Sequence, residues 1–155
     1  MTTPLALNLQ HILEGRVLMG VGAQTGASSQ FSHVQLWNPA ASGSRLVITK
    51  LLMRVGVTSG VLARRYTTAL TTLSGGGRKK LDLSGSGAAE IRTQTDASAL
   101  GEVAFGDWTL NANTPITENL ENFPLVLLPG TGLNLQASVV NTTLTATFQW
   151  MEVAG

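Results

Sequence analysis

The most regular pattern of hydrophobic and polar residues lies near the C-terminus of the chain. Between residues 143 and 153, Leu, Ala, Phe and Trp take every second position from 144 to 150, with Thr or Gln between them. Residues 133–140 also alternate, and Asn141-Thr142 separates the two runs. A period of two is typical of a strand with one buried face, and a short Asn-containing link is typical of a tight turn. The pattern predicts a β-hairpin.

Three β-prone runs occupy the first half of the chain. Residues 31–37 end at the turn signal Asn38-Pro39, and residues 45–58 are joined to residues 61–72 by Ser59-Gly60. Within residues 45–58 both alternating sets contain apolar side chains, but one set also carries two cations. We therefore expect the uncharged set to face the core. Its members are Val47, Leu51, Met53, Val55 and Val57.

Shorter elements are predicted elsewhere. Strands are expected near residues 80–83, 88–95, 103–110 and 125–128, with one helical turn near residues 117–122. We interpret the stretch that holds Gly20, Gly22 and Gly26 as a flexible loop. Short strands separated by Gly, Pro and Asn turns, without alternating helices, predict an all-β fold. The expected architecture is an antiparallel β-sandwich that resembles a jelly roll.

The N-terminal segment has two interpretations. Leu5, Leu7 and Leu9 alternate as in a strand, whereas Leu5, Leu9, Ile12 and Leu13 also share one face of a helix. We favour a short helix or arm that docks apart from the main sheet, where it packs either against a neighbouring subunit or under its own sandwich.

Length and composition fit a single domain. The chain has 155 residues, and we divide it into an N-terminal arm with a glycine-rich loop, residues 1–30, and one β-sandwich domain, residues 31–155. Only 12% of the residues are charged, against about 25% in an average soluble domain.

No apolar run approaches the roughly 20 residues that span a bilayer. The N-terminus also lacks the basic and apolar stretches of a signal peptide, so we expect no membrane partner.

Candidate catalytic and metal-binding groups are few. The absence of cysteine excludes disulfides, a thiolate nucleophile and cysteine zinc sites. The two histidines, His11 and His33, lie across a glycine-rich stretch and lack the spacing of a metal site. His33 shares its strand parity with Phe31 and Trp37, which favours a packed or interface histidine. Ser86 does not complete the Gly-x-Ser-x-Gly pattern of a hydrolase. We predict no catalytic residue, no metal and no cofactor.

Two other patterns resemble ligand-binding sites but are explained more simply as ordinary loop and core residues. The glycines at residues 20–26 and 75–77 resemble phosphate-binding loops, but the first lacks a following helix and the second lacks the Walker spacing. Asp107 beside Trp108 is a pair seen in sugar sites, although a tryptophan in a β-sandwich is usually part of the core.

Charge is distributed in blocks. Residues 1–44 sum to zero, residues 45–81 carry eight Lys or Arg and no acid, and residues 82–155 carry eight acids and one Arg, giving charges of 0, +8 and −7. The blocks could neutralise each other within one fold, or a basic face could meet an acidic face of a neighbouring subunit. Nucleic-acid binding is the third interpretation and the least favoured, because Tyr66 is the only aromatic residue in the basic block. We expect no nucleic-acid partner.

Two segments resemble small tailed-bacteriophage virion proteins. The first is the strand–turn–strand segment Val34–Ile48, VQLWNPAASGSRLVI. The second combines LPGTGL at Leu128–Leu133 with NTTLTATFQW at Asn141–Trp150. The resemblance implies a jelly-roll-like β-sandwich that serves as a capsid decoration (cement) protein or as an accessory tail or collar protein. It implies no catalytic residues.

On that resemblance we expect a non-enzymatic virion structural protein, most simply a decoration protein that binds and stabilises the capsid lattice. Its expected partners are the major capsid protein or neighbouring virion subunits and further copies of the chain, with a trimer favoured by analogy. It would be assembled in the cytoplasm of the bacterial host and reside in the virion. The residues expected at interfaces come from the arm and the basic block: Leu5, Leu7, Leu9, Ile12, Leu13, Arg64, Arg65, Arg78, Lys79 and Lys80.

The alternative function is a tail or collar accessory protein, or a β-sandwich module that binds a receptor or carbohydrate. A solvent-accessible Trp108 beside Asp107 in a shallow groove would favour that alternative.

Overall fold

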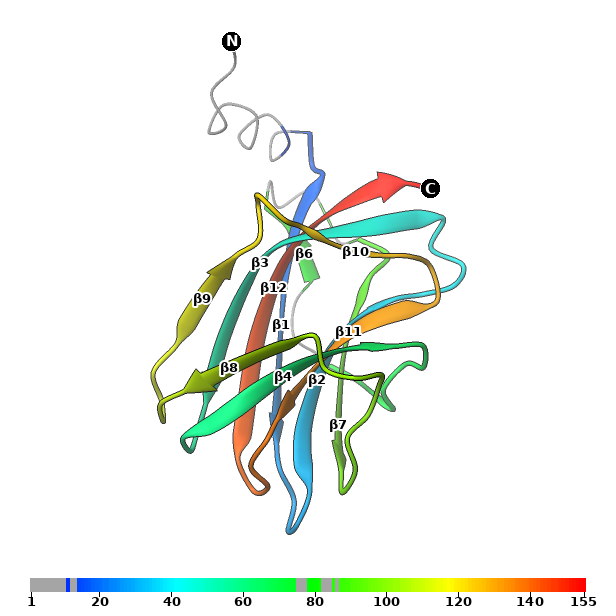
Figure 1. Ribbon diagram of the computed structural model, residues 1–155. Coiled ribbons are helices and arrows are strands. Elements are labelled where there is room, and N and C mark those ends of the chain that lie inside the picture. Colours follow the sequence, from blue (N-terminus) through cyan, green and yellow to red (C-terminus); the bar gives the residue numbers. More distant parts are fainter. Residues whose placement is uncertain (1–10, 12–13, 75–77, 82–84, 86) are drawn as a thin grey trace.

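A computed structural model describes residues 11, 14–74, 78–81, 85 and 87–155. These residues form strands that assemble into two antiparallel sheets packed face to face (Figure 1). The strands are β1 (Val17–Thr25), β2 (Phe31–Asn38), β3 (Ser44–Val55), β4 (Ser59–Tyr66), β5 (Thr72–Leu73), β6 (Arg78–Lys80), β7 (Glu90–Asp96), β8 (Gly106–Leu110), β9 (Ile116–Asn119), β10 (Leu125–Leu127), β11 (Thr131–Ala137) and β12 (Thr143–Ala154).

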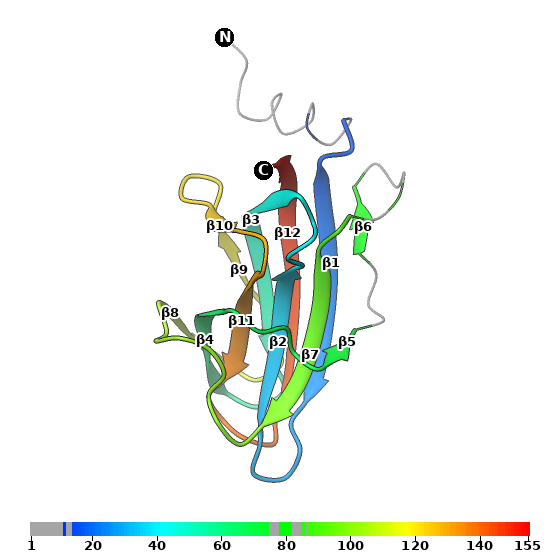
Figure 2. The same ribbon diagram turned by 90° about the vertical axis from the view of Figure 1, so that its right-hand side faces the viewer.

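The two sheets differ in strand order. Sheet A runs β10-β3-β12-β1-β6, with β9 also paired to β3, and sheet B runs β5-β7-β2-β11-β4-β8. Figure 2 shows β6 and β4 at opposite sides of the sandwich. The all-β sandwich predicted from the sequence is confirmed.

The topology is that of one long antiparallel hairpin rolled into a sandwich. β1 pairs with β12, β2 with β11, β3 with β9 and β10, and β4 with β8. Each early strand therefore pairs with its counterpart from the end of the chain, which is the arrangement of a jelly roll. The remaining strands, β5, β6 and β7, lie between β4 and β8 in sequence and extend the two sheets at the side of β1 and β2.

The C-terminal alternation correctly predicts buried positions but not the pairing. Phe148 and Trp150 of β12 are fully buried and are among the largest side chains of the core. However, β11 pairs with β2 and β4 in sheet B, whereas β12 pairs with β1 and β3 in sheet A. The predicted hairpin is therefore wrong, and residues 138–142 connect the two sheets. Alternation identifies a buried face but carries no information on which strand lies alongside.

The core-facing set predicted for β3 is correct only beyond Thr49. Gln149 pairs with Lys50 and Trp150 with Ile48, so Thr49 is an extra residue that forms a β-bulge. A bulge inverts the alternation of side chains along the strand that carries it. Leu51, Met53 and Val55 are buried as predicted. Before the bulge the opposite set is buried, namely Leu46 and Ile48, while Val47 is half-buried and Val57 lies exposed after the strand.

The glycines predicted to form a flexible loop lie in β1 instead. A Cβ atom on Gly20 would lie 2.9 Å from Cγ1 of Ile91, and one on Gly22 would lie 2.7 Å from Cγ2 of the same residue. The glycines therefore allow β1 to approach the side chains of sheet B closely. The connecting loop begins only at Gly26.

Other boundaries are also corrected. The helical turn predicted near residues 117–122 is wrong, because residues 116–119 form β9 beside β3. The strand predicted at 61–72 ends at Tyr66, and the one predicted at 103–110 begins at Gly106. The interface candidates of the arm, Leu5, Leu7, Leu9, Ile12 and Leu13, lie outside the described residues.

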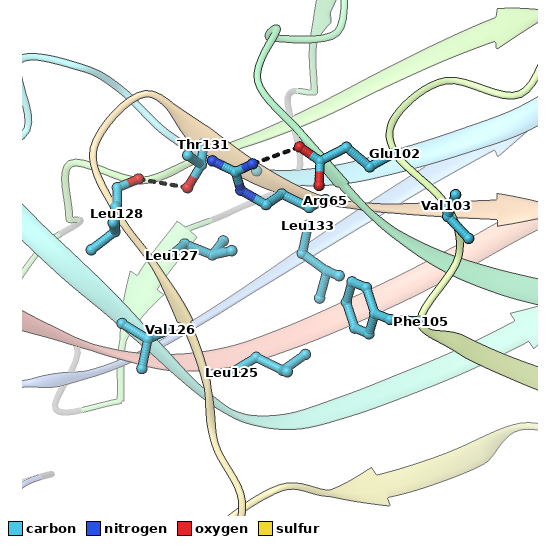
Figure 3. A pocket seen from close by; sticks show the side chains of 11 residues that line it. Arg65, Glu102, Val103, Phe105, Leu125, Val126, Leu127, Leu128, Thr131 and Leu133 are labelled. Atoms are coloured by element: carbon cyan, nitrogen blue, oxygen red, sulfur yellow. Dashed lines mark hydrogen bonds and ion pairs between the residues drawn. The ribbon is translucent and has the colours of Figure 1, made fainter.

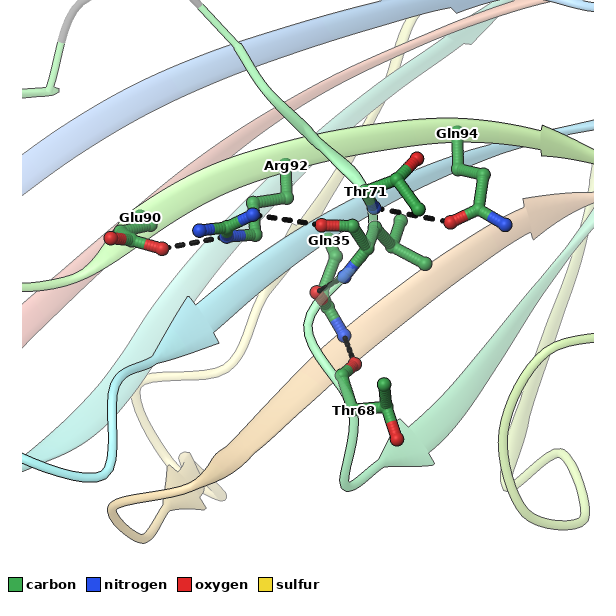
Figure 4. Close-up of polar contacts among 7 residues, drawn as sticks. Gln35, Thr68, Thr71, Glu90, Arg92 and Gln94 are labelled. Carbon is green, nitrogen blue, oxygen red and sulfur yellow. Dashed lines mark hydrogen bonds and ion pairs between the residues drawn. The ribbon is translucent and has the colours of Figure 1, made fainter.

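The outer face of sheet B is covered by the chain's own loops. The Gln35 side chain donates to the Thr68 carbonyl at 3.0 Å and accepts from the Leu70 amide at 2.9 Å (Figure 4). Arg92 donates to the Leu70 carbonyl at 2.9 Å and pairs with Glu90 at 2.6 Å. These contacts hold the segment after β4 over the sheet and bury polar side chains that would otherwise face solvent.

Candidate functional site

The outer face of sheet A, called here the open face, remains exposed to solvent. Val21, Thr147, Leu52 and Thr117 form one row across β1, β12, β3 and β9. Val21 is 38% exposed and Leu52 is 40% exposed. Neighbouring rows add threonines from β12, so the surface is mostly uncharged, unlike the covered outer face of sheet B.

Three cations from β3 lie on the open face. Arg45, Lys50 and Arg54 point away from the core because Leu46, Leu51 and Val55 point into it. The ion pairs among the described residues are formed by other cations: His11, Arg16, Arg65 and Arg92. A shallow pocket of about 220 Å³ next to Arg54 is lined by Leu52, Thr145 and Thr147. The open face can therefore receive a partner that is acidic or rich in hydroxyl groups.

A second surface feature is an apolar groove at one edge of the sandwich, between β10 of sheet A and the β4–β11 side of sheet B. This edge groove has a volume of about 410 Å³. Figure 3 shows Leu125, Leu133 and Phe105 around the same space. The full lining is Arg65, Glu102, Val103, Phe105, Leu125–Leu128, Thr131, Gly132 and Leu133.

The rim of the edge groove exposes large apolar side chains. Val103 is 88% exposed, and Phe105, Val126 and Leu128 are each a little over half exposed. Phe123, which precedes β10, is 85% exposed. Single exposed apolar residues are common, but a cluster of them beside an apolar groove marks an interaction site.

An ion pair lies at the mouth of the edge groove. Arg65 Nη1 lies 2.5 Å from Glu102 Oε1, and Arg64 Nη1 donates to the Glu102 carbonyl at 2.9 Å. Both contacts fix the segment that carries Val103 and Phe105 against β4. The pair also joins the basic block of the sequence to its acidic block, as expected if the blocks partly neutralise each other within the fold.

The structure does not bring the basic interface candidates together. Arg64 and Arg65 lie in β4, whereas Arg78, Lys79 and Lys80 form β6 beside β1. These strands lie at opposite sides of the sandwich (Figure 2). These candidates therefore do not form one continuous patch, because β4 belongs to sheet B and β6 to sheet A. Their place at interfaces stays a prediction.

His33 is a fully buried residue of sheet B. Its Nδ1 accepts a hydrogen bond from Asn134 Nδ2 at 3.1 Å, which requires the proton on Nε2 in the neutral ring. Asn134 also donates to the Leu100 carbonyl at 2.7 Å. Burial lowers the pKa of His33, and the Ser98 backbone, Asp96 and Asn134 oppose that shift only in part. The expectation of a packed histidine is confirmed.

Trp108 is half-buried and packs against the core. Its indole Nε1–H donates to Glu118 Oε1 at 2.8 Å, while the neighbouring Asp107 is exposed. The polar end of the indole is therefore already bonded within the chain. The described residues contain no group of three or more His, Asp or Glu side chains that could hold a metal ion.

Sequence reasoning missed the edge groove and predicted only part of the open face. The edge groove combines residues 102–105 with residues 125–133, which pattern analysis assigned to separate short elements. The signal available in the sequence was the presence of Val103, Phe105 and Phe123 in an otherwise polar stretch. On β3, the outward side of Leu52 and Arg54 follows from the predicted core-facing set, whereas the position of Arg45 on the open face depends on the bulge at Thr49.

Comparisons with protein-family models, with curated proteins and with solved structures found no match to this chain. No helix in the described part of the chain is long and apolar enough to cross a membrane.

Proposed function

We propose that this chain is a structural protein that docks onto an ordered array of protein subunits through its open face. The observation that carries the proposal is the contrast between the two sheets. On sheet B the chain's own loops cover Gln35, His33 and Asn134, whereas on sheet A Val21 and Leu52 are exposed in a row that holds no charged residue.

A sheet surface of threonine, valine and leucine suits a protein partner. Such a surface loses little hydration on contact, because it holds few charges, and its short side chains lose little conformational entropy. Arg45, Lys50 and Arg54 then favour an acidic partner surface and fix its orientation, since complementary charge contributes more to specificity than to affinity.

The resemblance of two segments to tailed-phage virion proteins gives the proposal its specific form. We infer a capsid decoration protein that stabilises the capsid lattice in a bacteriophage virion, with the major capsid protein as partner and no enzymatic activity. Self-association into a closed oligomer, of which a trimer is the favoured form, would repeat the open face with the symmetry of the lattice.

The test uses virions purified from the host culture that produces this chain. A decoration protein is expected at a copy number close to that of the major capsid protein, with density above the capsid lattice in a reconstruction. A low copy number with density at the tail vertex would favour the tail or collar alternative, and absence from the particles would refute both. Binding on a glycan array, lost in Trp108→Ala, would instead favour the carbohydrate-binding module.

A further inference from the structure

We infer that the edge groove binds the N-terminal leucine segment, residues 5–9, of a second copy of this chain, which enters as an extended strand beside β10. The inference deepens the proposed function by naming the contact between copies, and it rests on that function only in requiring an oligomer.

The groove offers both apolar side chains and an available strand edge. β10 pairs with β3 through Leu125–Leu127, and within the described part of the chain no strand pairs with its other edge. The backbone groups of a strand point alternately to its two sides, so an edge strand is a template for one more strand. Four consecutive residues, Leu125–Leu128, line the groove, which places the β10 backbone along its wall.

The leucine segment has the matching chemistry. Residues 1–10, MTTPLALNLQ, contain no charged side chain. In an extended strand, residues Leu5, Leu7 and Leu9 lie on one face, about 7 Å apart. That face can insert leucines against Phe105, Leu125 and Leu133, while Ala6 and Asn8 point the other way. Main-chain pairing with alternate side chains in an apolar groove is a recurrent mode of peptide binding.

The short length of chain between the leucine segment and β1 favours insertion into the groove of a second copy over insertion into the groove of the same copy. Val17, Met151, Val47 and Val126 lie in one row across β1, β12, β3 and β10, so three strand spacings, about 14 Å, separate β1 from β10. The Arg16 amide donates to the His11 carbonyl at 3.0 Å, which holds His11 beside the start of β1. From His11, Leu9 can reach only about 7 Å. A strand paired with the free edge of β10 would lie one spacing further, about 19 Å from β1. Leu9 falls short of that position in its own chain, so all three leucines can be used only by a neighbour.

This arrangement joins different surfaces of successive copies. β1, which follows the leucine segment in sequence, and β10, which lines the groove, lie apart in sheet A with β12 and β3 between them. Head-to-tail contacts of this kind generate closed rings when the rotation between copies closes.

Site-specific disulfides test the inference on the full chain, which has no cysteine of its own. Copies with Leu7→Cys are mixed with size-tagged copies carrying Val126→Cys under mild oxidation. The expected result is a mixed disulfide dimer on a non-reducing gel. Val21→Cys is the matched control, because Val21 is an exposed valine on a strand far from β10, and it should not cross-link above background.

Two outcomes would overturn the inference. One is equal cross-linking of Leu7→Cys to Val126→Cys and to Val21→Cys. The other is a Leu7→Cys/Val126→Cys double variant that closes its disulfide within a monomer. Sedimentation gives an independent measurement, because Val126→Asp should shift the chain from oligomer to monomer while Val21→Asp should not. Circular dichroism verifies that each variant keeps its β fold.

The failure of this inference is distinguishable from failure of the proposed function. A chain that is monomeric at every concentration but is found on the capsid lattice refutes the arm exchange and leaves the docking function standing. A chain that forms the Leu7–Val126 cross-link but is absent from virions refutes the docking function and supports the arm exchange.

Discussion

Gly22 of β1 and Ile91 of β7 face each other so closely that a methyl group on Gly22 would lie 2.7 Å from Ile91 Cγ2. Cγ1 of Val34 would lie 2.8 Å from the same methyl group. The two sheets therefore meet through a backbone on one side and branched side chains on the other. The glycine is part of the packing between the sheets rather than a point of flexibility.

Gly22→Ala should destabilise the fold. The added methyl group must displace Ile91 or Val34 in a packed core, which costs about 1–3 kcal/mol in the free energy of unfolding. Urea denaturation measures this loss as a lower midpoint with an unchanged slope. Gly85→Ala is the control, because a Cβ there would have no atom of a described residue within 4 Å. Equal midpoints for the two variants would contradict the close approach of the sheets.

The Trp108–Glu118 hydrogen bond should contribute to stability at the edge of the sandwich. Trp108→Phe keeps most of the ring but removes the donor that lies 2.8 Å from Glu118 Oε1. Because the acceptor is a half-buried carboxylate, we expect a loss of about 1–2 kcal/mol. Glu118→Gln retains an acceptor oxygen and should cost less. If Glu118→Gln were as destabilising as Trp108→Phe, the charge rather than the hydrogen bond would be responsible.

The fold was more predictable than the surfaces, and Thr49 shows why. Strand positions follow from local alternation, so Phe148 and Trp150 could be assigned to a buried face from their spacing alone. The bulge at Thr49 leaves no mark in the amino-acid composition. Before Thr49 it reverses which side chains of β3 are buried, compared with the alternation predicted from the sequence. Strand pairing depends on contacts between distant residues, which is why a predicted hairpin became a connection between sheets.

The candidate surfaces were less predictable still, because each is defined by what other parts of the chain leave uncovered. Gln35 is a polar residue that is fully buried because the Thr68 carbonyl and the Leu70 amide bind its side chain. The edge groove needs β10 and Phe105 to meet from different sheets. Both features depend on contacts between residues far apart in the sequence, and neither produces a pattern in the local sequence.

His33 should make the stability of the protein depend on pH. Burial lowers its pKa below the usual value of 6.5 in the folded state. As the pH falls below 6.5 the unfolded chain binds a proton that the folded chain does not, so the free energy of unfolding decreases towards the folded-state pKa. The slope contributed by this group is at most about 1.4 kcal/mol per pH unit. His33→Gln should flatten the curve of stability as the pH falls below 6.5, whatever its effect at neutral pH. Parallel curves for the two proteins would show that His33 does not titrate differently on folding.

On the proposed docking function, removing charge from the open face should weaken binding to the capsid lattice. Arg54→Gln removes one exposed cation that makes no ion pair with any described residue, so the fold should keep its stability. If Arg54 faces an acidic partner, we expect a loss of about 1 kcal/mol in binding, which is roughly a fivefold weaker Kd. The double variant Lys50→Gln/Arg54→Gln should lose more binding free energy, and the difference from the unaltered chain should shrink as salt screens the charges.

Binding is measured by co-sedimentation with virions from which the chain has been removed. Thr68→Glu is the control, because it changes the net charge by the same amount on the covered side of sheet B, where Thr68 is exposed. If Thr68→Glu weakened binding as much as Arg54→Gln, net charge rather than the open face would govern docking.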